Sequence, residues 1–262
     1  MLLLLVRASL AVLTLVLFAF PAAAITVTAI DSGFVTEFGG SGKGDSTIPT
    51  SATYNYSVGR EIHYGAGYLF SPPVAMDRNN YFVFDLTSVT TPIASATLDL
   101  YTGAYESVDP FETFDLIAPT DVAAAAADAA FLLTESTVGS IAFDDAGDPA
   151  IGVAMALYGN IEGGTGGPIG TTVISSAEDT STISIAVDAA FLNLFLGSTV
   201  VIGGSVSSIV GTGTPQQPFG LTDIDIPGGD PLTPALELTL VPEPGTALLL
   251  GLGLTGLAAR RR

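Results

Sequence analysis

Residues 78–101, RNNYFVFDLTSVTTPIASATLDLY, contain two different strand patterns separated by a short polar turn. The segment YFVFDL is apolar at consecutive positions, which is typical of a central strand that is buried on both faces. The segment TLDLY alternates polar and apolar residues, which is typical of a strand with one buried and one wet face. The stretch therefore predicts two paired strands in the core of a β-sheet.

The same two patterns recur along the chain. TISIAV (Thr182–Val187) and LELTL (residues 236–240) alternate, whereas TVVIGGSV (Thr199–Val206) is apolar enough for a central strand. Turn signals such as GGSGKGD, DDAGDP, GGTGGP and PGGDP lie between these runs. The chain has no cysteine, so strand pairing and packing must stabilise it without disulfides. Residues 25–240 are therefore predicted to form one all-β domain, a β-sandwich or jelly roll.

One segment predicts a helix within this β-rich domain. In DVAAAAADAAFLL, Asp121 precedes an alanine run of high helix propensity and is placed as an N-cap. The pentapeptide DAAFL occurs at residues 128–132 and again at 188–192. We interpret the repeat as two similar local helix starts, since nothing around the two copies repeats. One or two short helices are expected.

Residues 78–101 also resemble the paired core strands of jelly-roll modules of bacterial surface proteins, some of which bind carbohydrate. The resemblance implies a domain that works outside the cell. An ordinary β-sandwich hairpin has much the same pattern, so the ligand class stays open.

The N-terminus, MLLLLVRASLAVLTLVLFAFPAAA, has the three parts of a secretory signal peptide: an early cation, an apolar run and small residues. Arg7 supplies the cation and residues 8–20 the uncharged run. Ala22 and Ala24 fit a cleavage site of the A-x-A type, so residues 1–24 are predicted to be removed and Ile25 to start the mature chain. The alternative is an uncleaved membrane helix.

The C-terminus, VPEPGTALLLGLGLTGLAARRR, also has three parts. An extended motif is followed by the uncharged residues 245–259 and by a cationic end. A membrane-spanning helix needs about 20 residues, and arginines at its end stay on the cytoplasmic side. The motif consists of Val241, Pro242, Glu243 and Pro244, and the cationic end of Arg260, Arg261 and Arg262.

Taken together, residues 241–262 resemble a PEP-CTERM sorting signal. The resemblance implies that exosortase, a membrane-embedded protease-transpeptidase, recognises the Pro-Glu-Pro motif and removes the tail. It further implies a protein anchored in the inner membrane before processing and placed on the cell surface or in the extracellular matrix afterwards. Bacteria with this system generally also make exopolysaccharide, which makes a polysaccharide the expected partner. A plain single-pass anchor without processing is the alternative.

The charge of the chain excludes one class of partner. Its formal net charge is −19, and Lys43, Arg60 and Arg78 are the only cations between residues 25 and 240. Such a surface repels phosphate backbones, so no nucleic acid is expected to bind.

The acidic residues could instead bind divalent cations. Asp223, Asp225 and Asp230 offer hard oxygen ligands of the kind that calcium prefers. Solvated acidic loops have the same composition, and no other cofactor is expected.

Catalytic motifs are scarce. His63 is the only histidine, and without cysteine or a G-x-S-x-G segment the chain has no recognisable nucleophile motif.

Four tyrosines lie close together in the sequence and are candidate carbohydrate contacts: Tyr54, Tyr56, Tyr64 and Tyr68. Packing within the fold would also explain them. Three functions stay open: a non-catalytic surface or matrix protein, which we favour, a carbohydrate-binding module, and a secreted glycosidase with two facing carboxylates.

Overall fold

A computed structural model describes most of the region between the two terminal segments. The described residues are 23–37, 41–42, 56–63, 74–103, 105–134, 149–164, 166–209, 216–219 and 233–241.

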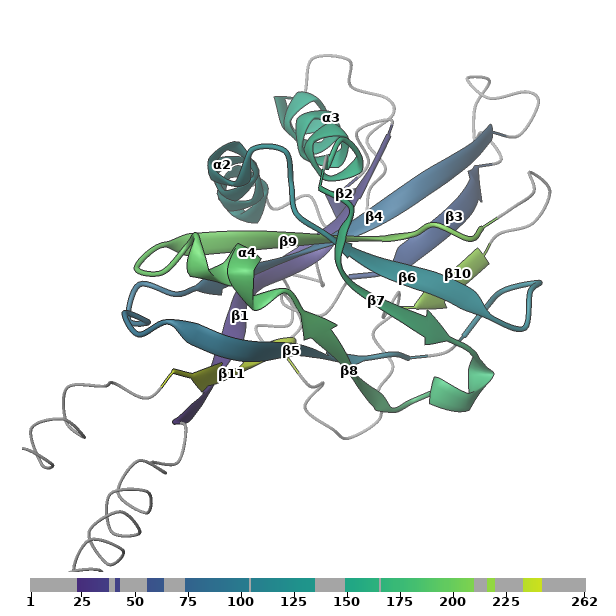
Figure 1. The fold of residues 1–262 in the computed structure, drawn as a ribbon. Helices are drawn as coiled ribbons and strands as arrows, with labels where there is room; N and C mark the ends of the chain where they lie inside the picture. The colour runs from purple at the N-terminus through teal and green to yellow at the C-terminus, as the bar shows by residue number, and fades with distance from the viewer. Residues whose placement is uncertain are drawn as a thin grey trace, which may run out of the picture.

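In the ranges that the structure describes, the chain is mostly β, with helices inserted at three places (Figure 1). The strands are β1 (Ala24–Thr36), β2 (Ser41–Gly42), β3 (Val58–His63), β4 (Val74–Asp85), β5 (Ile93–Tyr101), β6 (Glu112–Ile117), β7 (Pro168–Ile174), β8 (Thr182–Val187), β9 (Thr199–Val206), β10 (Gln216–Phe219) and β11 (Ala235–Leu240). The helices are α2 (Val122–Thr134), α3 (Pro149–Glu162), α4 (Ala189–Asn193) and the 3-10 helix η1 (Ser176–Glu178).

Strand β1 is long and belongs to both halves of the sheet. Its first residues pair with β11, from Ala24 opposite Thr239 onward, and its later residues pair with β4. The register with β4 shifts between Ala29 and Asp31, which marks an irregularity of the kind that bends a strand. The bent strand therefore carries the sheet around a corner.

The sheet curls until its two ends approach each other. The strand order is β7-β6-β9-β4-β1-β11-β5-β8, and neighbouring strands pair antiparallel. The terminal strands β7 and β8 lie next to each other, because Asp188 N donates to Ile169 O at 2.7 Å and Gly170 has no room for a side chain beside Ala186 O. The predicted all-β fold is confirmed, as a nearly closed antiparallel sheet.

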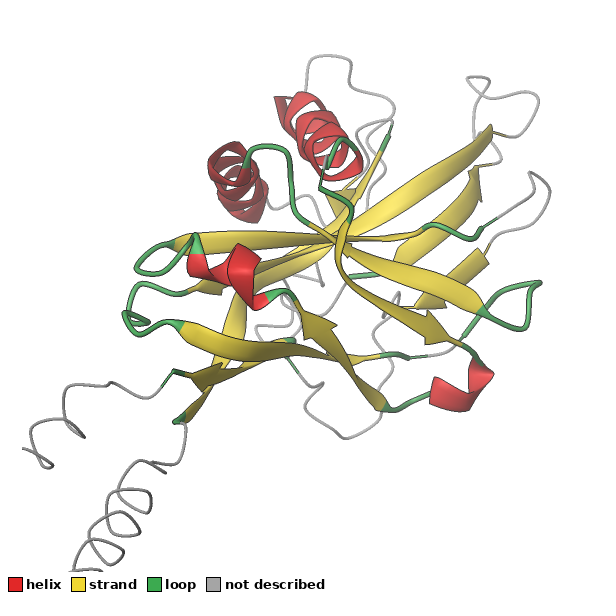
Figure 2. Cartoon of the chain, in the orientation of Figure 1, coloured by secondary structure: helices red, strands yellow, loops and turns green. Residues whose placement is uncertain are grey.

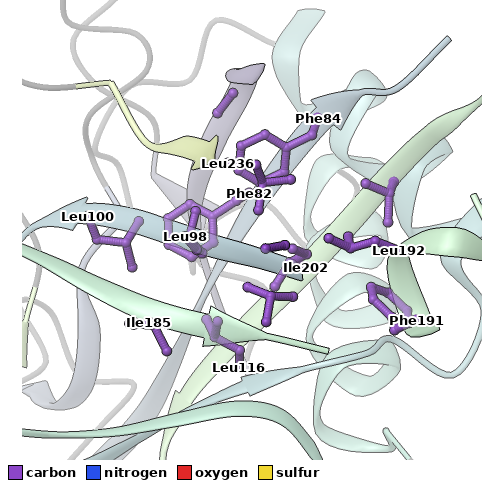
Figure 3. Packing of buried hydrophobic residues seen from close by; sticks show 14 of the residues in the cluster. Phe82, Phe84, Leu98, Leu100, Leu116, Ile185, Phe191, Leu192, Ile202 and Leu236 are labelled. Atoms are coloured by element: carbon purple, nitrogen blue, oxygen red, sulfur yellow. The ribbon is translucent and has the colours of Figure 1, made fainter. Parts of the chain in front are cut away.

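The main core fills the inside of this curled sheet (Figure 3). Phe82 and Phe84 enter from β4, and Leu98 and Leu100 enter from β5 at every second position, as the alternation predicts. Burying a side chain of this size stabilises the fold by about 1.5–3 kcal/mol. Further members of this core include Leu116, Ile185, Phe191, Leu192, Ile202, Leu236 and Leu238.

A second core lies on the outer face of the sheet, under α2 and α3 (Figure 2). Tyr81 and Val83 of β4 point to this side, opposite Phe82 and Phe84. Strand β4 is thus buried on both faces, which is the reason for its continuous apolar run. The outer core also includes Val35, Val201, Ala125, Ala129, Leu132, Ala154, Leu157 and Ile161.

The two long helices differ in how well the sequence predicts them. Helix α2 begins as expected, because Asp121 Oδ1 accepts a hydrogen bond from Ala124 N at 3.0 Å. Helix α3 was missed, and its 14 residues exceed the short helices expected. Gly152 and Gly159 lower its intrinsic propensity, and its stability comes from an apolar stripe packed on the sheet. That stripe consists of Ala150, Ala154, Leu157 and Ile161.

Helix α3 approaches β9 so closely that β9 needs a glycine. A Cβ on Gly203 would lie 2.5 Å from Ile161 Cγ2. On the opposite face of the strand, a Cβ on Gly204 would overlap Asn80 Oδ1 and the Phe114 ring. The absence of side chains at Gly203 and Gly204 therefore lets α3 pack closely on one face of β9 and the inner core on the other.

We expect Gly203→Val to destabilise the domain by about 1–3 kcal/mol, because the added side chain must displace α3 from the sheet. Gly152→Ala is the matched control: its Cβ would meet nothing within 4 Å, so we expect a gain of about 0.5–1 kcal/mol. Urea unfolding of residues 25–241 measures both changes. Equal stability of wild type and Gly203→Val would contradict the observed helix position.

Candidate functional site at the junction with the sorting tail

Strand β11 is the last strand of the chain and also an interior strand of the sheet. It lies between β1 and β5, with Leu238 opposite both Ile25 and Ala96. Leu236 and Leu238 are fully buried in the inner core. The chain therefore stays folded to the end of residue 240, and the predicted sorting tail starts directly at the sheet.

The first residue of the predicted motif is itself held by the domain. Val241 N donates a hydrogen bond of 2.8 Å to Pro92 O, in the turn between β4 and β5, and its side chain is 40% exposed. The other predicted tail residues lie outside the described residues. They are Pro242, Glu243, Pro244, Arg260, Arg261 and Arg262.

The two ends of the folded domain meet at this junction. Ala24 and Ile25, predicted to flank the signal cleavage site, begin β1, and Leu240 N donates to Ala23 O at 2.8 Å. Figure 1 shows the start of β1 and the end of β11 at one corner of the molecule. Ala22 lies outside the described residues, and cleavage after Ala24 stays a prediction.

The side chain of Tyr56 lies in the inner core and not on the surface. Tyr56 is fully buried, its ring packs edge-on against Phe82 at a centroid distance of 5.4 Å, and its hydroxyl donates to Tyr101 O at 2.9 Å. A ring in this position cannot stack on a sugar, so the carbohydrate contact hypothesised for Tyr56 is corrected to a core role. Tyr54, Tyr64 and Tyr68 lie outside the described residues.

The candidate calcium ligands Asp223, Asp225 and Asp230 also lie outside the described residues. Within the ranges that the structure covers, no group of three or more His, Asp or Glu side chains could hold a metal ion. His63 ends β3, where it is paired with Val74 of β4.

Carboxylates on the sheet surface accept hydrogen bonds from hydroxyl groups on neighbouring strands. Asp115, for example, accepts from Thr171 Oγ1 of β7 at 2.7 Å and from Ser207 Oγ, directly after β9, at 2.6 Å. These cross-strand contacts let an acidic surface form with few cations. Two further pairs are Thr26 with Glu237 and Ser184 with Asp99.

The sequence analysis missed a charged cluster where α3 meets the sheet. Arg60 and Asp77 form a two-pronged ion pair of 2.6 and 2.9 Å, and this contact raises the pKa of Arg60. Partial burial raises the pKa of Glu37, and the nearby carboxylates of Asp77 and Glu162 add to the shift. Nothing in the sequence signals a cluster whose members are so far apart along the chain.

The same cluster ties α3 to β4. Glu162 Oε2 accepts from Asn79 Nδ2 at 3.0 Å, and Tyr158 one turn earlier has a pKa raised by burial. Arg78, the neighbouring cation, is buried with its guanidinium 4.0 Å from the centre of the Phe34 ring, and it donates to Ser57 Oγ at 2.6 Å. Arg60 and Arg78 thus both stabilise the fold through contacts within the domain.

Among the helices that the structure describes, none has the length and apolar composition that a membrane span requires.

We expect Glu37→Gln to stabilise the domain near pH 7, by less than about 1 kcal/mol because the group is partly exposed. The raised pKa means that ionising Glu37 opposes folding, so wild-type stability falls as pH rises through and above 4.5. The gain should vanish below that pH, where the carboxyl is protonated in both states. Urea midpoints at pH 3.5 and 7 test this, with the exposed Glu106→Gln as control, and an equal gain at both pH values would contradict it.

Comparison with known proteins bears on the tail. No curated protein matches the chain. The PEP-CTERM protein-sorting motif matches residues 240–262, from the last residue of β11 to the C-terminus. The match contains the Pro-Glu-Pro motif, the uncharged run and the arginine cluster. The chain is therefore an exported protein that carries a PEP-CTERM sorting tail, by which it is anchored at the membrane until exosortase processes it.

Proposed function

We propose that this chain is a non-catalytic protein of the cell surface or extracellular matrix, and that the curled β-domain is the cargo that tail processing delivers. The observation that carries the proposal is the direct continuation of β11 into the matched motif. Because Leu236 and Leu238 pair with strands on both sides, removal of the tail leaves the domain intact. A protein built in this way keeps its fold after release.

The use of the carboxylates supports a non-catalytic role. Glu112 is buried and accepts hydrogen bonds from Ser107 at 2.6 Å and from Ser208. Asp99, Asp115 and Glu237 accept from hydroxyls of adjacent strands. A glycosidase needs one carboxyl free to protonate the leaving group and a second facing it across the bond. Carboxylates engaged in such contacts serve the fold instead.

The charge of the domain favours a particular kind of matrix. At a net charge of −19, copies of the protein repel one another and also repel acidic polymers. A neutral polysaccharide, bound through hydroxyl and carboxylate hydrogen bonds, is therefore the partner that fits best. Exosortase is the partner during processing, and the polysaccharide is the partner of the mature protein.

Replacement of the motif glutamate tests the sorting step. We expect Glu243→Gln to insert normally but to stay unprocessed, because the flanking Pro242 and Pro244 predict an extended motif in which the glutamate is the only charged group. Intact mass and membrane release of the protein, expressed with its exosortase, are the measurements. Neutral replacement of Arg260, Arg261 and Arg262 should instead disturb topology.

Glu237→Gln is the matched control, since it makes the same chemical change in β11 at an exposed pair with Thr26. It should be processed as the wild type is. Trimming and release of Glu243→Gln at the wild-type rate would contradict exosortase recognition and would leave the tail as a plain anchor.

Co-sedimentation with purified exopolysaccharide tests the matrix role. We expect the mature protein to sediment with neutral exopolysaccharide and to leave the polymer's reducing-end count unchanged. Growth of reducing ends would identify a glycosidase. Tight binding to one short oligosaccharide on a glycan array would identify a carbohydrate-binding module, and absence of any sedimentation would contradict the polysaccharide association.

A further inference from the structure

The corner where the chain leaves β11 is built from three segments, which we call the exit corner. They are the β4–β5 turn (residues 86–92), the α4–β9 turn (residues 194–198) and Val241. Figure 2 shows both turns as loops at the end of the molecule where β1 starts and β11 ends. The exit corner is therefore the part of the domain nearest to the sorting tail.

Hydrogen bonds lock these segments together. Leu86 N donates to Ser198 O at 2.9 Å, and Gly197 N donates to Leu86 O at 3.1 Å. The Asn193 side chain accepts from Ile93 N at 2.8 Å and donates to Ile93 O at 2.9 Å. With the bond from Val241 to the β4–β5 turn, the tail leaves from a fixed point on a rigid surface.

The residues of the exit corner themselves contain no ionisable side chain, in contrast to much of this acidic chain. Residues 23–30, 86–98 and 189–209 contain no ionisable side chain. Asp85 and Asp188 directly precede two of these ranges, and Asp85 Oδ1 accepts a hydrogen bond from Thr87 N of the β4–β5 turn at 2.9 Å. Leu194, the C-cap of α4 and the first residue of the α4–β9 turn, is 77% exposed, the most exposed of the large apolar residues described. A corner with few charges and an exposed leucine is suited to a polar–apolar boundary.

The length of the tail limits how far this corner can stand from the bilayer. Three residues separate Val241 from Gly245, so the Cα atoms of Val241 and Gly245 are at most about 14 Å apart. The uncharged residues 245–259 would span only about 22 Å as a helix, less than the roughly 30 Å of hydrocarbon. The residues that flank this run are therefore drawn towards the headgroups, and the exit corner is drawn with them.

We infer that, while the tail is in the membrane, the exit corner rests on the lipid bilayer with Leu194 in the headgroup region. The inference rests on the membrane anchoring that the sorting tail provides. The rest of the domain, with its negative charge, is repelled by anionic lipids and points away from the surface. The short tether and the sparsely charged corner thus fix one orientation of the domain before processing.

Depth-dependent fluorescence quenching tests this orientation. The natural chain has no cysteine, so Leu194→Cys provides a single labelling site, and Phe111→Cys provides a matched site that is 65% exposed in the loop at the far end of β5. The unprocessed chain from residue 25 is reconstituted in vesicles of phosphatidylcholine and phosphatidylglycerol. We expect headgroup-quencher lipids to quench the label at Leu194→Cys and to leave that at Phe111→Cys at the solution background.

A flexible Gly-Ser insert of 20 residues between Val241 and Pro242 lengthens the tether by about 25 Å on average. We expect it to reduce quenching at Leu194→Cys to the background. Equal quenching at both labels, or quenching that the insert leaves unchanged, would overturn the inference.

Two further outcomes separate this inference from the function on which it rests. A chain that fails to float with the vesicles contradicts the membrane anchoring itself. A chain that floats, but whose Leu194→Cys label responds only after exosortase is added, identifies the protease as the occupant of the corner and overturns the assignment to lipid.

Discussion

The pairing of β1 with β11 is the contact on which the rest of the structure depends. It joins the first strand of the domain to the last, and because β1 continues into its pairing with β4, it also joins the two halves of the sheet. The inner core closes only when β11 is in place, since Leu236 and Leu238 are part of it. The same pairing brings both chain ends to one corner, where the sorting tail begins.

The sequence predicts the strands of this sheet well because their patterns have simple physical causes. TISIAV alternates because β8 has one buried face, and its predicted bounds are those observed. YFVFDL and TVVIGGSV are continuously apolar because β4 and β9 lie between the inner core and the two helices. The helices are harder to predict. The pentapeptide DAAFL lies within α2 in one copy, whereas Asp188 caps α4 in the other, so its neighbours decide its role.

Features that depend on long-range contacts could not be predicted. The burial of Tyr56 follows from its contact with Phe82, and a tyrosine-rich segment alone does not distinguish a core ring from an exposed one. The cluster around Arg60 joins β3, β4 and α3, and no local pattern indicates it. The sorting tail is different, because its three parts are contiguous and were identified directly. What the structure adds is that the tail follows an interior strand.

The most direct test of this account is amide hydrogen exchange in β11 of the anchored, unprocessed protein. If β11 is an interior strand that closes the core, the amides of Leu236 and Leu238 should exchange as slowly as those of Val200 and Ile202 in β9. Exchange of the β11 amides as fast as that of exposed loops would show that the last strand is detached. That result would contradict both the closure of the sheet and the fixed exit of the tail.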